Sequence, residues 1–157
     1  MLPAGLEQRL ATQLDAVLQR VRTAQAEAVA WRPPTSQWSA HENLAHLGRM
    51  HEVMRERLER ILAEDRPALS RYRAEEDAAW PDWQALATSE ILERVIALRR
   101  QLGGRIAALS DAELARVGVH SRLGAMDVPA WLEFFLLHEA HHLYVILIRL
   151  AEARGAS

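Results

Sequence analysis

Three histidines of this chain have the residue type and spacing of a metal site. His138 and His142 stand in the segment HEAHH, and on a helix two residues four apart project from one face. Two such imidazoles can bind one cation, and a third donor completes a site. His46, much earlier in the segment WSAHENLAHL, is the best candidate. Three neutral imidazoles on a divalent transition metal leave a coordination position open to water or substrate, so the pattern predicts a reactive metal centre.

The other histidines are less well placed for the same ion. His41 and His51 each lie about 140° from His46 around the predicted helix, at about 100° per residue, so that helix offers one imidazole to a given point. His141 lies about 60° from the first histidine of HEAHH and is the alternative ligand. His120 falls in a predicted loop and has no partner by spacing.

HEAHH also matches the HExxH pattern of zinc peptidases, in which the glutamate, here Glu139, serves as general base. The match is short, and Val145 and Ile148 stand where an extended motif needs glycine and histidine. The peptidase hypothesis is therefore the weaker one, and we expect Glu139 to be structural or to support a ligand. Arg149 is expected to be a solvated charge near the helix end, the alternative being contact with an anionic substrate.

The elements that must position these residues are helices. Apolar residues recur at helical spacing in four long stretches, and strand-like alternation is absent, so we predict an all-α fold. The long helices are expected at about 5–29, 40–64, 89–108 and 128–154, with a short helix near 111–116.

Residues at the helix ends support these boundaries. Capping boxes, in which a serine and a glutamate three residues later bond each other's backbone amides, are predicted at Ser39–Glu42 and Ser110–Glu113. Thr88 is available to cap the third long helix. Pro129 falls in the first turn of the last helix, where the missing N–H is not needed.

The connection between helices 2 and 3, about 65–88, is long for a helical bundle. A helix of about 25 residues is about 37 Å long, and twenty-odd linker residues cross that length easily, so helices 2 and 3 can run parallel. The linker carries Tyr72, Trp80 and Trp83, and we expect these aromatic side chains to pack over the bundle.

Composition limits the function classes. At 157 residues the chain fits a single domain, 1–157, and it contains no cysteine, which excludes disulfides, thiolate metal ligands and a cysteine nucleophile. All nineteen basic residues are arginine, and acidic residues are interleaved with them at a net charge of −2. Because no basic stripe forms, we expect no nucleic-acid partner.

The chain shows neither a signal-peptide-like segment nor a run of about eighteen apolar residues, so we expect no membrane partner and a cytoplasmic location. The last long helix is apolar or histidine around most of its circumference. Such a helix is central in its bundle or covered by a partner chain, and we therefore predict a homodimer.

The two histidine-containing segments resemble motifs of a known protein family. The segment WSAHENLAHL resembles the W-S-x-x-E-x-x-x-H-L element of the DinB/YfiT-like superfamily, and HEAHH resembles its C-terminal H-E-x-H-H element. The resemblance covers nearly the whole chain. It implies a four-helix bundle with up-down-down-up topology, usually dimeric, that holds a nickel, zinc or similar ion by His46, His138 and His142. Relatives in the family include enzymes that act with the thiols mycothiol or bacillithiol, and metal-dependent hydrolases.

Two hypotheses about function follow. In the first, the chain is a metal-dependent enzyme, a thiol-dependent S-transferase or a hydrolase, in which a divalent zinc or nickel ion activates water or a low-molecular-weight thiol against a small-molecule substrate. In the second, it is a non-enzymatic dimer of the stress response that binds a metal or a small ligand. An acid or base near the open coordination position would favour the enzyme, and the sequence offers only Glu139, His141 and Arg149.

Overall fold

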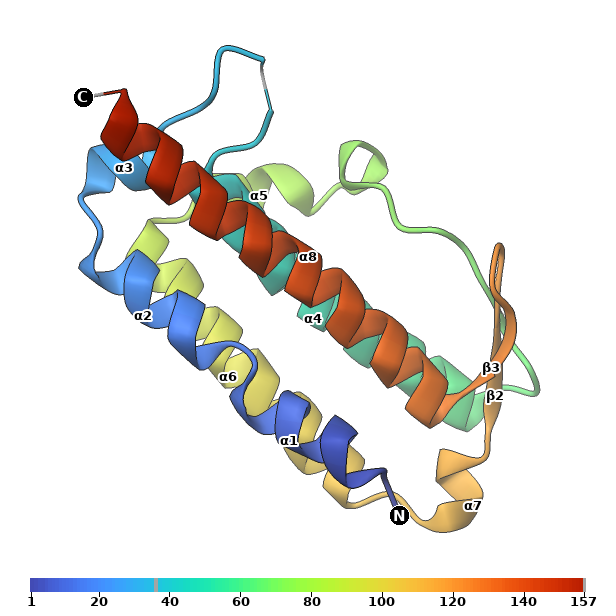
Figure 1. The fold of residues 1–157 in the computed structure, drawn as a ribbon. Helices are drawn as coiled ribbons and strands as arrows, with labels where there is room; N and C mark the ends of the chain where they lie inside the picture. Colours follow the sequence, from blue (N-terminus) through green and yellow to red (C-terminus); the bar gives the residue numbers. More distant parts are fainter. Residues whose placement is uncertain (36, 157) are drawn as a thin grey trace.

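The computed structural model describes residues 1–35 and 37–156, and these are predominantly helical. The longer helical segments run along one common axis (Figure 1). They are a broken first segment and the three long helices α4 (Ala40–Ala63), α6 (Thr88–Ala107) and α8 (Val128–Gly155). Helix α4 packs against both α6 and α8, and the first segment contacts α6 and α8. The predicted four-helix bundle is thus confirmed.

The first segment is not the continuous helix that was expected over 5–29. It consists of α1 (Ala4–Thr12), α2 (Asp15–Thr23) and α3 (Ala26–Ala30). At the ends of α1 and α2 a threonine hydroxyl donates to the carbonyl four residues earlier, at 3.0 Å in α1 and 3.1 Å in α2. Such bonds weaken or bend a helix, whereas the apolar stripe that was used for the prediction continues across the break between α1 and α2.

Three short strands also depart from the all-helical expectation. They are β1 (Ala68–Leu69), β2 (Val117–His120) and β3 (Gly124–Asp127), and β2 lies parallel to β1 and antiparallel to β3. Gly118 lets β2 approach α4 closely, because a Cβ there would lie 2.8 Å from Ile61 Cγ1. Strands of two to four residues are too short to show a clear alternating pattern, so the sequence analysis did not predict them.

The long connection between α4 and α6 returns along the bundle (Figure 1). After β1 it contains the 3₁₀ turn η1 (Ala74–Glu76) and the short helix α5 (Trp80–Ala85). Helix α5 rests on α4 at Gly48, where a Cβ would overlap the Trp83 ring, and the Trp83 indole N–H donates to Glu52 Oε2 at 3.0 Å. The aromatic linker therefore packs over the bundle, as predicted.

The helix ends mostly follow the sequence prediction. Both predicted capping boxes are present, at the start of α4 and at the start of the short helix α7 (Asp111–Leu114). The predicted cap at Thr88 was wrong, because the N-cap of α6 is Ala87. The Thr88 hydroxyl lies instead 2.9 Å from His41 Nδ1, so it joins the starts of α4 and α6.

Helix α8 is a core helix of the bundle. By length and composition alone it could cross a membrane. Its Glu139 and Arg149, however, are buried and bond to groups of other segments, and Trp131 and Phe135 are among the largest fully buried side chains. These contacts give α8 the role expected of the central helix. Its opposite face leaves the large apolar side chains of Leu137 and Tyr144 exposed.

Candidate metal centre

The three histidines selected from the sequence lie together between α4 and α8. One ligand nitrogen from each of His46, His138 and His142 lies within 4.8 Å of the other two. The Nε2 atoms of His46 and His138 are 3.3 Å apart. Two nitrogens bound at about 2.05 Å to one tetrahedral ion would be about 3.3 Å apart, so this separation fits a divalent transition metal.

The surroundings keep all three imidazoles neutral. Burial, followed by the charges of neighbouring groups, lowers the pKa of His46 to about 3, of His138 to about 4 and of His142 to about 2. A neutral imidazole has a free lone pair on one ring nitrogen, and a metal ligand must have one. Near pH 7 the cluster can therefore bind a cation without first releasing protons.

Asn43 orients the ring of His142. The Asn43 amide nitrogen donates to the Ser39 carbonyl at 2.8 Å, so its oxygen is the atom that faces His142 Nδ1, also at 2.8 Å. The Nδ1 atom must then carry the proton, which leaves the Nε2 lone pair free for the cluster. The capping residue of α4 thus fixes the amide, and the amide fixes the tautomer of a candidate ligand.

The rings of His46 and His138 are oriented by packing. Their Nδ1 atoms are buried and have no hydrogen-bond partner in the described part of the chain. The ring centroid of His46 lies 5.1 Å from that of Trp38 and 5.6 Å from that of Tyr72. These aromatic rings shield the cluster, and they come from the segment before α4 and from the linker.

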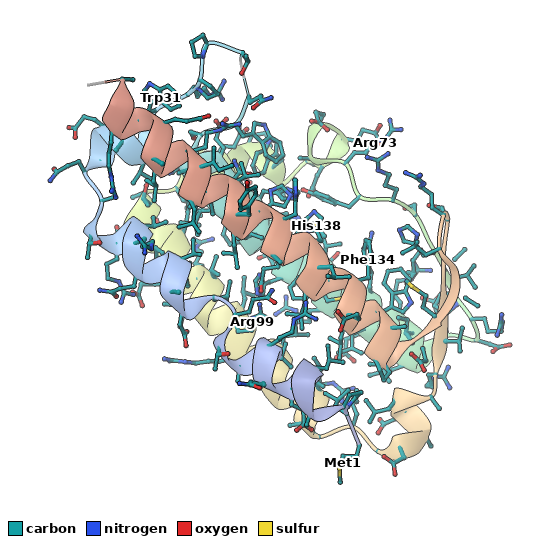
Figure 2. All side chains as sticks on the ribbon, viewed as in Figure 1. Met1, Trp31, Arg73, Arg99, Phe134 and His138 are labelled. Carbon is teal, nitrogen blue, oxygen red and sulfur yellow. The ribbon has the colours of Figure 1, made fainter. Side chains whose placement is uncertain are left out.

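A cavity of about 520 Å³ opens onto the three histidines, which form part of its wall. Cavities of about 300–1,000 Å³ are typical of small-molecule sites. The rest of the wall comes from α4, α8, the linker and the β2–β3 hairpin, and Figure 2 shows Arg73 of the linker across from His138 and Phe134 of α8. The cluster is therefore accessible to a small molecule.

The remaining histidines lie outside the cluster. His41 is bonded to Thr88 and to the Gln84 carbonyl, and His51 is buried with Nδ1 2.7 Å from a carbonyl of its own helix. His141, the alternative ligand, is exposed on α8. The three histidines that helical spacing selected are thus the ones whose side chains converge in the structure.

Glu139 does not line the cavity. It is fully buried, its Oε1 accepts from Gln13 Nε2 at 2.8 Å, and its Oε2 accepts from the Arg99 guanidinium. This carboxylate joins α8 to the first segment and to α6, which agrees with a structural role and not with a peptidase general base.

The expectation that Arg149 is a solvated charge was wrong. It is only 8% exposed, and its Nε donates to the Trp38 carbonyl at 3.0 Å while Nη1 pairs with Glu152. Arg149 does not line the cavity, so it does not meet a substrate there either. It holds the segment that carries Trp38 against α8.

Sequence reasoning missed several residues of the cavity wall, chiefly His120, Arg57 and Arg122. His120 lies in β2 and not in a loop, and its Nδ1 accepts the backbone N–H groups of Arg122 and Leu123, each at 3.1 Å. The alternating valines before His120 were a weak signal for a strand. No spacing pattern connects Arg57 on α4 with the hairpin, because only the tertiary fold brings them to one cavity.

The family model of the DinB superfamily matches residues 9–146 of the chain. The fold is similar to that of YfiT from Bacillus subtilis, with a TM-score of 0.78 at 20% sequence identity, over 96% of this chain and 86% of that chain. YfiT is described as a probable metal-dependent hydrolase with an unusual four-helix bundle topology. A comparison with curated proteins finds no match.

Proposed function

The chain belongs to the DinB superfamily, and on that premise we propose that it is a metal-dependent enzyme that acts on a small molecule. One observation carries the proposal: neutral nitrogens of His46, His138 and His142 converge on the wall of an open cavity. The description of the similar Bacillus protein as a probable metal-dependent hydrolase supports the same class.

The three histidines would hold zinc or nickel, since imidazole binds both. Such an ion lowers the pKa of a water or a thiol in its open position and so supplies an anionic nucleophile at neutral pH. The chain itself supplies neutral donors, the Asn43 bond that orients His142, and the rings of Trp38 and Tyr72 that keep bulk water from the ligands.

In this proposal the nucleophile is a small molecule and not a cysteine, serine or threonine of the protein. The chain has no cysteine, and no serine or threonine is among the described residues that line the cavity. Water would make the reaction a hydrolysis, and a low-molecular-weight thiol would make it an S-transfer. We propose these two reactions as the alternatives to be separated by assay.

Metal analysis and two activity assays test the proposal. Purified protein is expected to hold one zinc or nickel per chain, and His142→Ala is expected to lose it. His141→Ala is the matched control, because that neighbouring histidine lies outside the cluster. Hydrolysis of p-nitrophenyl acetate and transfer of N-acetylcysteine to monochlorobimane then report the two reactions, and we expect activity in the parent and in the control variant only.

A metal-loaded parent with neither activity would instead favour the second hypothesis, a non-enzymatic dimer of the stress response that binds a metal or a small ligand. The exposed side chains of Leu137 and Tyr144, 58% and 63% exposed on α8, support a homodimer because a partner chain could cover them. A cytoplasmic location stays a prediction from composition, and cell fractionation would test it.

A further inference from the structure

One buried arginine differs from the others in its partners. Among the described residues the buried arginines are Arg57, Arg99 and Arg149. Arg99 pairs with Glu139, and Arg149 pairs with Glu152. Arg57, only 8% exposed, forms no ion pair with any carboxylate in the described ranges. The neighbouring Glu56 carboxylate, whose charge acts on Arg57, is exposed and pairs with Arg49, so no carboxylate of the described residues contacts Arg57 directly.

The contacts of Arg57 hold it in place without balancing its charge. Its Nη2 donates to the Ser70 carbonyl at 2.8 Å, and its guanidinium carbon lies 5.4 Å from the Trp131 ring centroid. A buried charge without a counter-ion is unfavourable, and arginine does not escape the problem by losing its proton. Arg57 lines the cavity, so an anion in the cavity could supply the missing counter-charge.

Arg57 shares one cavity with the metal cluster and the hairpin. Arg57 of α4, His120 of β2 and His138 of α8 all line its wall. One small molecule in the cavity could therefore contact all three.

Other donors line the same cavity. Arg71 of the linker and Arg122 of the β2–β3 hairpin form no ion pair with the described residues, and Arg73 pairs with Glu76. One carboxylate, Glu75, is among the described residues of the wall. The cavity thus presents three guanidinium groups without an ion pair to the described residues and one carboxylate, an excess of positive charge that suits a negatively charged ligand.

His120 adds a neutral donor to this wall. Because its Nδ1 accepts two backbone N–H groups at 3.1 Å, its proton must reside on Nε2. The Nε2–H is not engaged by the described residues, and the His120 side chain lines the cavity. It is available to donate to an oxygen of a ligand.

We propose that the substrate of this site carries an oxyanion, a carboxylate or a phosphate group, that Arg57, Arg122 and the His120 Nε2–H bind while the reacting group faces the three histidines. The proposal rests on the proposed metal-dependent activity and names its substrate class. Guanidinium groups bind these oxyanions through paired hydrogen bonds, which fixes orientation as well as charge. Arg57 and Arg122 are specificity residues in this view, and the metal ligands are separate from them.

Calorimetric titration of the zinc-loaded, full-length protein tests the proposal. The probes are succinate and inorganic phosphate, with succinamide as the uncharged analogue of succinate. The variants are Arg57→Met and Arg122→Gln, and Arg55→Gln is the matched control, because it removes an exposed arginine of α4 two residues from Arg57. Zinc content is measured for every variant, so that loss of the metal is recorded separately from loss of anion binding.

We expect the parent to bind at least one of the two anions about tenfold or more tightly than succinamide, and the stronger anion to identify the source of the oxyanion. Arg57→Met and Arg122→Gln should each weaken that binding by about 10- to 100-fold, the loss usual for a hydrogen bond to a charged group. Arg55→Gln should change it less than about twofold, and all four proteins should hold one zinc per chain.

Equal affinity for succinate, phosphate and succinamide would overturn the proposal, and so would unchanged anion affinity in Arg57→Met and Arg122→Gln. If Arg57→Met does not fold, Arg122→Gln decides, because that arginine is exposed on a hairpin turn. A parent that binds no zinc refutes the proposed metal centre instead. The same titrations on the metal-free protein then still show whether the arginines bind the anion.

Discussion

Replacing Asn43 by leucine tests how the protein prepares His142 for a metal. Leucine has a similar volume and no acceptor, so the 2.8 Å bond to His142 Nδ1 is lost and the ring is free to turn or to change its tautomer. Loss of such a supporting hydrogen bond usually lowers metal affinity about 10- to 100-fold. At about 1.4 kcal/mol per factor of ten, this is about 1.4–2.8 kcal/mol of binding free energy.

Competition against a chromophoric zinc chelator measures the dissociation constant for zinc. Asn43 also donates to the Ser39 carbonyl at 2.8 Å, so Asn43→Leu should lower the free energy of unfolding by about 0.5–1.5 kcal/mol as well. Gln84→Leu is the matched control, because it removes a half-buried amide that bonds Glu42 at 3.2 Å and lies outside the cavity. It should lose stability and keep its zinc affinity.

A dissociation constant for zinc that is unchanged in Asn43→Leu would refute this reasoning. Packing alone would then orient His142, as it orients His46 and His138. An equal loss of zinc affinity in Gln84→Leu would refute it in another way, since the effect would then follow general stability and not the ring of His142.

Three further predictions concern the core, the pH dependence and the dimer. Glu139→Leu leaves the buried Arg99 unpaired and should lower the free energy of unfolding, measured in urea, by about 3–5 kcal/mol. The double variant that also carries Arg99→Leu should recover much of that loss. Additive losses of the two substitutions would contradict the pairing. Burial and Arg99 lower the pKa of His51 from 6.5 to about 3, so only the unfolded chain takes up this proton between those pH values. The His51 imidazole should therefore lower the free energy of unfolding by about 1.4 kcal/mol when the pH falls from 7.5 to 5.5. His51→Gln should remove this contribution from the pH dependence of unfolding in urea. Leu137→Asp with Tyr144→Ser should convert a dimer into a monomer in sedimentation, and an unchanged mass would exclude this face of α8.

The sequence was sufficient to select the candidate ligands because helical geometry is local. His138 and His142 are neighbours on α8 whatever surrounds them, and their distance from His46 in the chain matters little once α4 and α8 pack together. The capping boxes are equally local, since each depends on two side chains and one turn of backbone. These features did not depend on knowing the tertiary fold.

The cavity wall and the small sheet could not be predicted in this way. Arg57 and Arg122 are 65 positions apart in the sequence, and each alone has the pattern of an ordinary surface arginine. Strand β2 exists because β1 and β3 pair with it and Gly118 admits it against α4, not because its four residues have a strong intrinsic preference. Contacts between distant segments decide such elements, and a single sequence does not show them.

The segment HEAHH illustrates why a short motif does not fix a chemistry. Its first and last residues, His138 and His142, point into the cavity, whereas Glu139 points into the core and contacts Gln13 and Arg99 from other helices. In an HExxH peptidase the glutamate must reach the water that it activates. Here the carboxylate is fully buried and accepts hydrogen bonds from two donors. One face of α8 therefore carries two candidate metal ligands, and the adjacent face contacts the other helices of the bundle. The acid or base of any reaction must come from the cavity wall instead, where the imidazole of His120 and the carboxyl group of Glu75 lie outside the histidine cluster.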